Sequence, residues 1–241
     1  MLSFRVRPFL TANWRYLAML NYVVDPKVVT PFVPPGTEID FDNGETFLSV
    51  VGFLFLDTRL VGLPIPLHRD FEEVNLRFYV RKKSADTWRR GVVFVRELVP
   101  RHAIATIARV FYGEPYLAVP MSHNIDHVDL QLSVEYSWKR GRKSESLKMS
   151  ASGEPQAILA GSHAEFITEH YWGYTSFRGG CSEYRVEHPR WKTWNAEKFE
   201  FKADLGTLYG NQFVESLRVA PRSAFIADGS PIQVLLREQL A

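Results

Sequence analysis

Alternating polar residues in one short segment, residues 71–81, are the part of this chain best suited to chemistry. If this segment is a β-strand, Glu73, Asn75, Arg77 and Tyr79 share one face, because successive side chains of a strand point to opposite sides. A glutamate in such a row can transfer a proton, and an arginine can hold a carboxylate through two parallel hydrogen bonds. Two interpretations fit the pattern. The polar face lies in solvent, or it lines an internal cavity where these groups must pair with one another or with a ligand.

A second group of polar and aromatic residues lies at residues 167–177 and 183–191. Strand alternation would place His170 and Tyr174 on one side of the first of these segments. Tyrosine and tryptophan suit both cores and ligand sites, so the aromatic content alone does not decide between them. Two histidines, His170 and His188, could bind a metal with a glutamate. However, no H-E-x-x-H spacing is present, and we expect no metal.

Other catalytic arrangements have little support in the sequence. The chain has one cysteine, Cys181, with no histidine that the sequence places beside it, and no G-x-S-x-G motif. Neither a G-x-G-x-x-G motif nor a phosphate-binding loop is present, so we expect no nucleotide or other cofactor.

Composition narrows the class of protein further. The 241 residues include 29 Lys and Arg against 27 Asp and Glu, a balance that does not favour nucleic-acid binding. A single cysteine excludes an internal disulfide framework. No signal peptide and no long apolar run is evident, so we expect a cytoplasmic protein that does not enter membranes. The aromatic content of 14% leaves room for a homo-oligomer.

The elements that must position these residues are mainly strands. Apolar runs and alternation predict strands over residues 45–62, 73–82, 90–100, 128–139, 146–152, 164–175, 182–191, 199–204 and 232–236. Helical signals are sparser and cover residues 25–34, 102–114 and 205–218. The sequence therefore predicts a single mainly β domain over residues 1–241, a β-barrel with a few peripheral helices.

Four segments of the chain, FEEVNLRFYV, RRGVVFVRELVP, ARVFYGEPY and EHYWGYT, resemble the DUF2071 (YqjF-like) family of bacterial proteins. The resemblance extends from about Trp14 to about Val234. Proteins of this family are similar in fold to acetoacetate decarboxylase, which implies an enclosed polar cavity inside the barrel.

The resemblance to acetoacetate decarboxylase also implies roles for particular residues. Its active-site arginine corresponds to Arg15, and its acid–base glutamate to Glu73, or to Glu72 if the register shifts by one residue. The lysine that forms an imine with the keto acid corresponds to Met121. A thioether cannot form an imine, so we do not expect decarboxylation through a Schiff base unless a lysine from elsewhere, such as Lys148, takes this role.

Three functions remain open from the sequence. The favoured one is a barrel that binds a small carboxylated or polar metabolite without Schiff-base chemistry. The second is an enzyme of the lyase, isomerase or hydrolase type that uses Glu73 as general acid or base with Arg15 or Arg77 holding a carboxylate. The third is a structural protein whose internal polar groups satisfy one another. The candidate site residues are Arg15, Glu73, Asn75, Arg77, Glu114, Tyr116, Met121, His170 and Tyr174.

Overall fold

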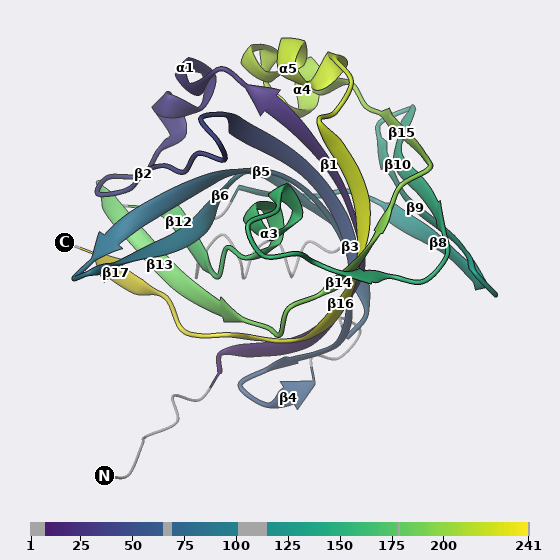
Figure 1. Ribbon diagram of the computed structural model, residues 1–241, viewed down its shortest axis with the longest axis horizontal. Helices are drawn as coiled ribbons and strands as arrows, with labels where there is room; N and C mark the ends of the chain where they lie inside the picture. Colours follow the sequence, from purple (N-terminus) through teal and green to yellow (C-terminus); the bar gives the residue numbers. More distant parts are fainter. Residues whose placement is uncertain (1–7, 65–68, 101–114, 178, 241) are drawn as a thin grey trace.

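A thirteen-stranded sheet that curls into a ring dominates the fold (Figure 1). The computed structural model describes residues 8–64, 69–100, 115–177 and 179–240. The ring is closed because Val186 pairs with Val234, and these two residues lie on the two end strands of the ring order given below. Around the ring, only the β6–β12 pair is parallel. The ring strands in order are β16 (Ser223–Val234), β1 (Leu10–Val24), β3 (Thr46–Leu60), β5 (Phe71–Ser84), β6 (Thr87–Val99), β12 (Trp172–Phe177) and β13 (Gly180–Glu187).

A smaller antiparallel sheet packs on the outside of this ring. Its strands, in spatial order, are β15 (Lys198–Lys202), β10 (Lys143–Ser152), β9 (Gln131–Arg140) and β8 (Met121–Val128). Six short strands complete the described structure: β2 (Glu38–Ile39), β4 (Leu63–Pro64), β7 (Tyr116–Ala118), β11 (Gln156–Ala157), β14 (Lys192–Asn195) and β17 (Glu238–Leu240). The prediction of a mainly β chain is confirmed.

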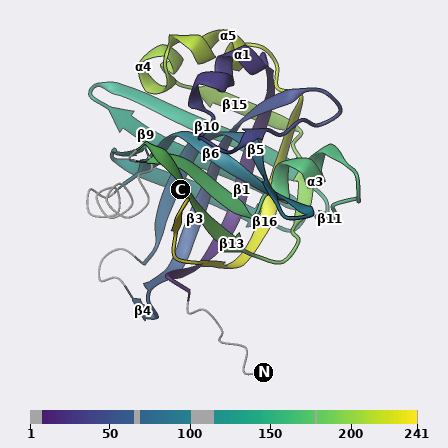
Figure 2. The ribbon, with the colours of Figure 1, turned by 90° about the vertical axis from the view of Figure 1, so that its left-hand side faces the viewer.

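Three of the short helices pack against the outside of the ring, and one lies within it (Figures 1 and 2). Two of the three predicted helical regions are confirmed. Residues 25–34 form α1 (Pro26–Val29) and the 3-10 turn η1 (Thr30–Phe32), and residues 205–218 form α4 (Leu205–Tyr209), η2 (Asn211–Phe213) and α5 (Val214–Arg218). The third, residues 102–114, lies outside the described residues. None of the described helices has the length and apolar character that a membrane crossing needs.

The strand predicted over residues 164–175 is wrong in its first half. Helix α3 (His163–Thr168) occupies that half, and β12 begins only at Trp172. The backbone N–H of Glu165 donates to the hydroxyl of Ser162, 3.2 Å away, which caps the helix N-terminus. The S-x-x-E spacing of Ser162 and Glu165 is typical of a helix N-terminus. The strand prediction followed the aromatic and apolar residues of the segment and missed this signal. This helix lies within the ring of strands in Figure 1.

The ring has two apolar cores, one on each face of its wall. We call the face toward α3 the inner face, where Met19, Val51 and Phe53 pack with Phe166 of α3. We call the other the outer face, where ring residues such as Leu76 pack against the second sheet. Both faces of β5 are therefore buried over most of its length. This excludes the interpretation in which its polar face lies in solvent.

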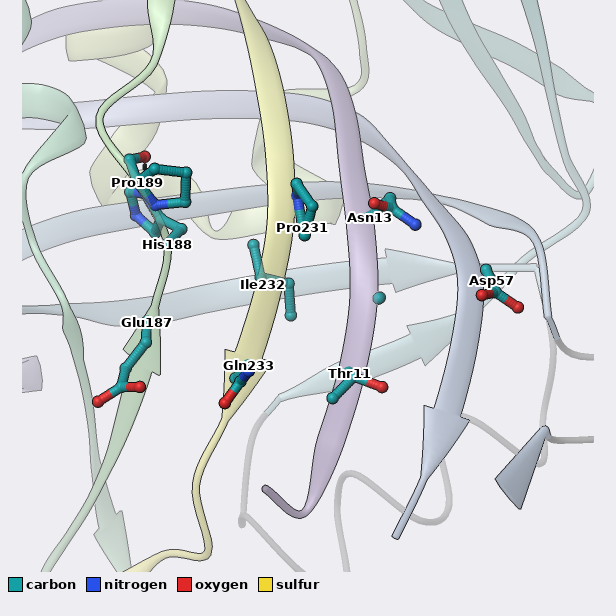
Figure 3. Close-up of a pocket in the computed structure, with 10 residues that line it drawn as sticks. Thr11, Asn13, Asp57, Glu187, His188, Pro189, Pro231, Ile232 and Gln233 are labelled. Carbon is teal, nitrogen blue, oxygen red and sulfur yellow. Dashed lines mark hydrogen bonds between the residues drawn. The ribbon is translucent and has the colours of Figure 1, made fainter. Parts of the chain in front are cut away.

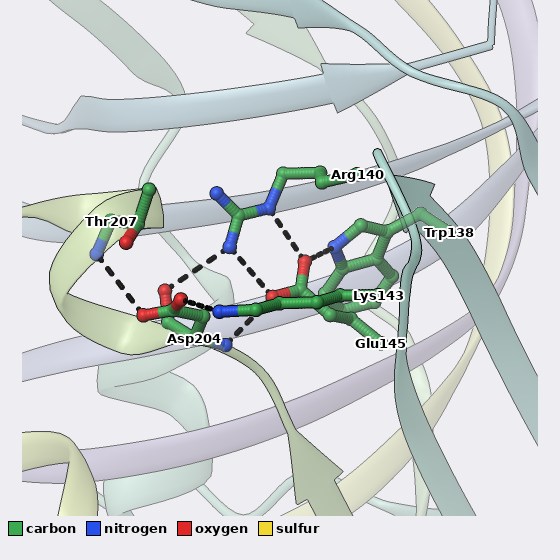
Figure 4. Close-up of polar contacts among 6 residues, drawn as sticks. All are labelled: Trp138, Arg140, Lys143, Glu145, Asp204 and Thr207. Atoms are coloured by element: carbon green, nitrogen blue, oxygen red, sulfur yellow. Dashed lines mark hydrogen bonds and ion pairs between the residues drawn. The ribbon is translucent and has the colours of Figure 1, made fainter.

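The basic segment at residues 138–146 forms the β9–β10 hairpin around Gly141, whose φ is 60°. Its buried carboxylate, Glu145, accepts hydrogen bonds from Trp138 Nε1 at 2.6 Å and from Arg140 Nε at 2.7 Å (Figure 4). Glu145 also accepts one from the backbone N–H of Asp204, at 2.7 Å, which precedes α4. The network joins the second sheet to the helices above the ring, so two of the hairpin's basic residues, Arg140 and Lys143, form ion pairs within the protein.

Candidate functional site

Glu73 carries a buried carboxyl group on the inner face, and the residue is 2% exposed. Asn75 Nδ2 donates to its Oε1 at 2.9 Å, and Tyr116 Oη donates to its Oε2 at 3.2 Å. Glu73 and Asn75 share a face because they are two residues apart on β5. Tyr116 arrives from β7, which runs parallel to β6 and pairs with it at Glu97. Strands β5 and β7 thus supply these three side chains.

A second carboxyl group that the sequence did not reveal belongs to this cluster. Glu97 pairs directly with Asn75 across β5 and β6, is 1% exposed, and also hydrogen-bonds Tyr116. A β-bulge shifts the β5–β6 register between Leu76 and Arg77, and this shift changes which residues of β6 face inward. Simple alternation cannot locate such a bulge, so no sequence signal identified Glu97.

Tyr184 is the second inner residue that the sequence analysis did not assign. It pairs with Gly173, and a Cβ on residue 173 would lie 2.1 Å from Tyr184 Cζ. The tyrosine ring therefore crosses the backbone of its neighbour strand at a place where only glycine leaves room. The phenol lies close enough to Tyr116 to contribute to the raised pKa of the Tyr116 hydroxyl.

Burial controls the charge state of this cluster. Loss of water raises the pKa of Glu73 to about 7, against the opposing effects of hydrogen bonds from Asn75 and Tyr116 and of the Arg77 charge. The pKa of Tyr116 is raised far above its ordinary value, first by burial and then by Glu73 and Glu97. Glu73 is therefore able to exchange a proton near neutral pH while Tyr116 remains a hydrogen-bond donor.

Arg77 is a charged residue of the inner face that is only partly buried. It is half-buried, whereas its neighbours on β5 from Phe71 to Leu76 are buried. One Nη2–H donates to the carbonyl of Ile167 in α3 at 3.3 Å, and the guanidinium carbon lies 5.7 Å from the ring centre of Tyr79. Among the residues that the structure describes, no acceptor lies within hydrogen-bonding distance of Arg77 Nε, and no donor reaches Asn75 Oδ1. These unused polar atoms are what a ligand or ordered water would satisfy.

The predicted site residue His170 lies on the inner face but at a distance from Glu73. Its Nε2 is 3.1 Å from Asp40 Oδ2, and its ring centre is 4.7 Å from that of Tyr79. Tyr79 follows Glu73 by six residues on the same strand, a separation of about 20 Å. Burial lowers the pKa of His170 to about 4, although Asp40 opposes this shift. His170 is thus a neutral residue near the opposite end of the inner face.

Three predicted site residues lie on the outer face. Arg15 pairs with Leu54, which pairs with Glu72, and directly opposed residues share a face. Met121 is half-buried and packs against the outer core, as does the buried Tyr174. The prediction that Arg15 and Glu73 belong to one site is therefore wrong, because the two side chains lie on opposite faces of the ring wall. Glu114 lies outside the described residues.

The structure also decides which glutamate faces inward. Glu72 is on the outer face, where its Oε1 lies 2.6 Å from Nδ1 of His123 on β8. Glu73 is on the inner face with Asn75 and Tyr116. The register expected for Glu73 is thus the one observed.

The lysines of the chain stay away from the inner cluster. All nine fall within the described residues, and eight of them are exposed. The ninth, Lys82, is half-buried with its Nζ 3.4 Å from Glu183 Oε2. Lys148, the alternative considered from the sequence, pairs with Glu135 at 3.0 Å on the second sheet.

A pocket of about 510 Å³ opens elsewhere, beside the ends of β1, β13 and β16 (Figure 3). None of the site residues predicted from the sequence lines it. Its two carboxylates are already paired, Glu187 with Arg185 at 3.2 Å and Asp57 with Arg59 at 3.3 Å. The lining residues are Thr11, Ala12, Asn13, Asp57, Glu187, His188, Pro189, Pro231, Ile232 and Gln233.

Metal-binding side chains do not gather in the described part of the chain, where no group of three His, Cys, Asp or Glu residues is arranged to hold an ion. The two histidines considered for a metal have different surroundings. His170 contacts Asp40, whereas His188 stacks on Trp191 at 4.1 Å between ring centres. Cys181 is buried in the outer core, and burial raises the pKa of its thiol to about 11.

Comparison with known proteins identifies the family. Residues 11–231 match the model of DUF2071, described as "Uncharacterized conserved protein", so the chain belongs to this family. It is 30% identical over 192 residues to the "Uncharacterized protein YqjF" of Bacillus subtilis (strain 168), a match that covers 77% of this chain and 75% of that protein.

Solved structures with the same fold include acetoacetate decarboxylase. The enzyme from Legionella pneumophila superposes with a TM-score of 0.66 at 14% identity, over 100% of this chain and 90% of its own. The enduracididine biosynthesis enzyme MppR, complexed with pyruvate, gives a TM-score of 0.66 at 14% identity, over 100% and 93%. An acetoacetate decarboxylase-like enzyme from Sphingomonas wittichii RW1 gives 0.65 at 13% identity, over 98% and 94%. At these identities the likeness shows the fold alone.

Proposed function

We propose that the inner face binds a small carboxylated metabolite, with Arg77 holding the carboxylate and Glu73 exchanging a proton with the ligand. The observation that carries this proposal is the state of Arg77. Arg77 is half-buried among buried residues of β5. Its Nε–H donates no hydrogen bond to any residue that the structure describes. A carboxylate fits the planar set of donors that arginine presents.

The charges around Arg77 are compatible with an anionic ligand. Glu73 has a pKa of about 7, so near neutral pH a large share of its carboxyl groups is protonated and does not repel an anion. Tyr116 and Asn75 add hydrogen-bonding groups beside Glu73. Pyruvate in the MppR complex is a small 2-oxo acid, which makes such acids the first ligands to test.

A second candidate function is an enzyme that moves a proton next to a carbonyl group. The observation that favours it is again the pKa of Glu73, because a general acid or base works best when its pKa is near the working pH. This chemistry needs no covalent intermediate. It therefore agrees with nine lysines that all lie away from the cluster.

Thermal shift and calorimetric titration with a panel of 2-oxo, 3-oxo and hydroxy acids test the binding proposal. We expect some acids to raise the melting temperature of the wild type, and Arg77→Met to abolish this shift. Arg185→Met is the matched control, since Arg185 is an exposed arginine on the outside of β13. A carboxylate site at Arg77 would be refuted if no acid raised the melting temperature of the wild type, or if the acids raised that of the wild type and of Arg77→Met equally. The internal polar network would then be a structural feature.

The enzyme and the binding protein differ in what happens to a bound acid. In deuterated water, an enzyme of this kind would exchange the hydrogen next to the carbonyl for deuterium, which proton NMR detects. Glu73→Gln should then stop the exchange while the acid still shifts the melting temperature. Binding without exchange identifies the chain as a binding protein for the acids tested.

A further inference from the structure

Strand β8 is an edge strand whose free side has no partner among the described strands. It pairs with β9 through eight consecutive residue pairs, from Met121 with Trp138 to Val128 with Gln131. It stands last in the order β15-β10-β9-β8, and Figure 1 shows it at the outer border of the second sheet. Six of its eight residues are exposed, and the other two, Met121 and Ile125, are half-buried.

The two edges of this sheet are built differently. The opposite edge, β15, has the sequence KFEFK and carries Lys198 and Lys202, and lysine on an edge strand discourages pairing with another chain. Strand β8 has no lysine, arginine or proline within its bounds and no bulge in its pairing with β9. Its last residue, Val128, is 59% exposed, and Leu130, two residues further on, is 52% exposed. An edge strand of this kind can pair with a strand of another chain.

The sequence of β8 complements itself about a two-fold axis. In an antiparallel pair of identical strands the axis is perpendicular to the sheet, so each residue meets one on the same face of the copy. When Ile125 meets Ile125 of a second copy, Asn124 stands opposite Asp126 of that copy, and the reverse. The amide can donate to the carboxylate at both places. Two apolar side chains meet at the axis.

We propose that two copies of this chain associate through antiparallel pairing of their β8 edges, centred on Ile125, so that the two outer sheets form one continuous eight-stranded sheet. Asn124 and Asp126 lie on the face of β8 that is turned away from the ring, because Met121, His123 and Ile125 oppose Trp138, Tyr136 and Val134 of the outer core. The inner face with Glu73 takes no part in the contact, so this association does not depend on the proposed ligand site.

A charge exchange between two exposed residues tests this arrangement. Sedimentation velocity of the full chain over a concentration series should show a monomer–dimer equilibrium. Asn124→Asp should weaken the dimer by about tenfold, because carboxylates then face each other twice. Adding Asp126→Asn restores one carboxylate and one amide at each place, and the double variant should dimerise as the wild type does. Asn195→Asp, the same change at an exposed position of β14, is the control.

Two outcomes would overturn the proposed contact, and a third would overturn its register. One is a wild type that stays monomeric at every concentration. The other is an Asn124→Asp variant that dimerises like the wild type, which would place the contact elsewhere. If Asn124→Asp weakens the dimer but Asp126→Asn does not rescue it, the pairing is centred on another residue and the Ile125 register is wrong. Ile125→Cys gives an independent check, because cysteines at the axis should form an intermolecular disulfide under an added oxidant while Cys181 is buried.

Discussion

Glu72 and Glu73 are neighbours in the chain, yet they lie on opposite faces of the ring wall. The Glu72 carboxylate is 2.6 Å from His123 on the second sheet, and the Glu73 carboxyl accepts from Asn75 and Tyr116 on the inner face. One residue of register separates the two environments. Burial on the inner face raises the pKa of Glu73 to about 7.

Glu73→Gln should change how stability depends on pH. The folded pKa of about 7 lies above the ordinary value of 4.5, so the folded state binds this proton more tightly than the unfolded chain does. Its stabilising contribution is therefore complete below pH 4.5 and is lost as pH rises toward 7. The shift corresponds to a free energy of unfolding on the order of 3 kcal/mol. Glutamine resembles the protonated acid and should remove this slope.

Urea unfolding at about pH 5 and about pH 8 measures this difference. We expect the wild type to lose more stability than Glu73→Gln between the two pH values. Glu187→Gln is the control, since the Glu187 side chain is 41% exposed and lies outside the inner cluster. Equal slopes for the wild type and Glu73→Gln would show that Glu73 does not titrate in this range.

The sequence predicted the strands with strong alternation and the inner polar row of β5. Glu73, Asn75 and Arg77 lie on one face as expected, because period-two alternation in a long strand leaves little freedom of register. The fifteen-residue strand β1 had no such signal, since apolar residues occupy both of its faces in turn. The prediction missed helix α3 because the aromatic residues in this part of the sequence are typical of a strand.

Bulges limited the prediction of the site. The register of β1 against β3 shifts between Arg15 and Ala18, where Tyr16 has a positive φ of 54°. A shift of this kind decides which side chains face inward, and the sequence does not mark it. Arg15 thus lies on the outer face, and Glu97 reaches the inner cluster beyond a similar shift in β6.

Gly173→Ala should destabilise the protein by about 1–3 kcal/mol, because the added methyl group overlaps the ring of Tyr184. Chemical unfolding measures the loss. The double variant Gly173→Ala/Tyr184→Ala removes the overlap, so Gly173→Ala should cost much less in the Tyr184→Ala background than alone. Equal costs in the two backgrounds would show that Tyr184 does not require glycine at this position.

Treatment with a 2-oxo acid and borohydride should leave no reduced imine on the wild-type chain. Imine formation at neutral pH needs a desolvated amine, and eight of the nine lysines are exposed while Lys82 pairs with Glu183. Intact-mass measurement detects an adduct directly.

Met121→Lys extends this test to the position at which the resemblance to acetoacetate decarboxylase predicted the lysine. Residue 121 lies on the outer face, across the ring wall from Glu73. We expect no specific adduct and no decarboxylation of 3-oxo acids from this variant. A trapped imine together with release of carbon dioxide would show that position 121 shares a site with Glu73.

Glu145→Gln should destabilise the link between the second sheet and α4. Burial alone would raise the pKa of Glu145, but hydrogen bonds from Arg140 and the Asp204 backbone lower it below 4.5. Its contribution is therefore present above pH 4.5 and is lost as pH falls through the lower folded pKa. At neutral pH the variant leaves the Arg140 charge unpaired at 15% exposure, a loss of about 3 kcal/mol. Urea unfolding should show this difference at neutral pH and a smaller one in acid. The opposite pH trend would contradict an ionised Glu145.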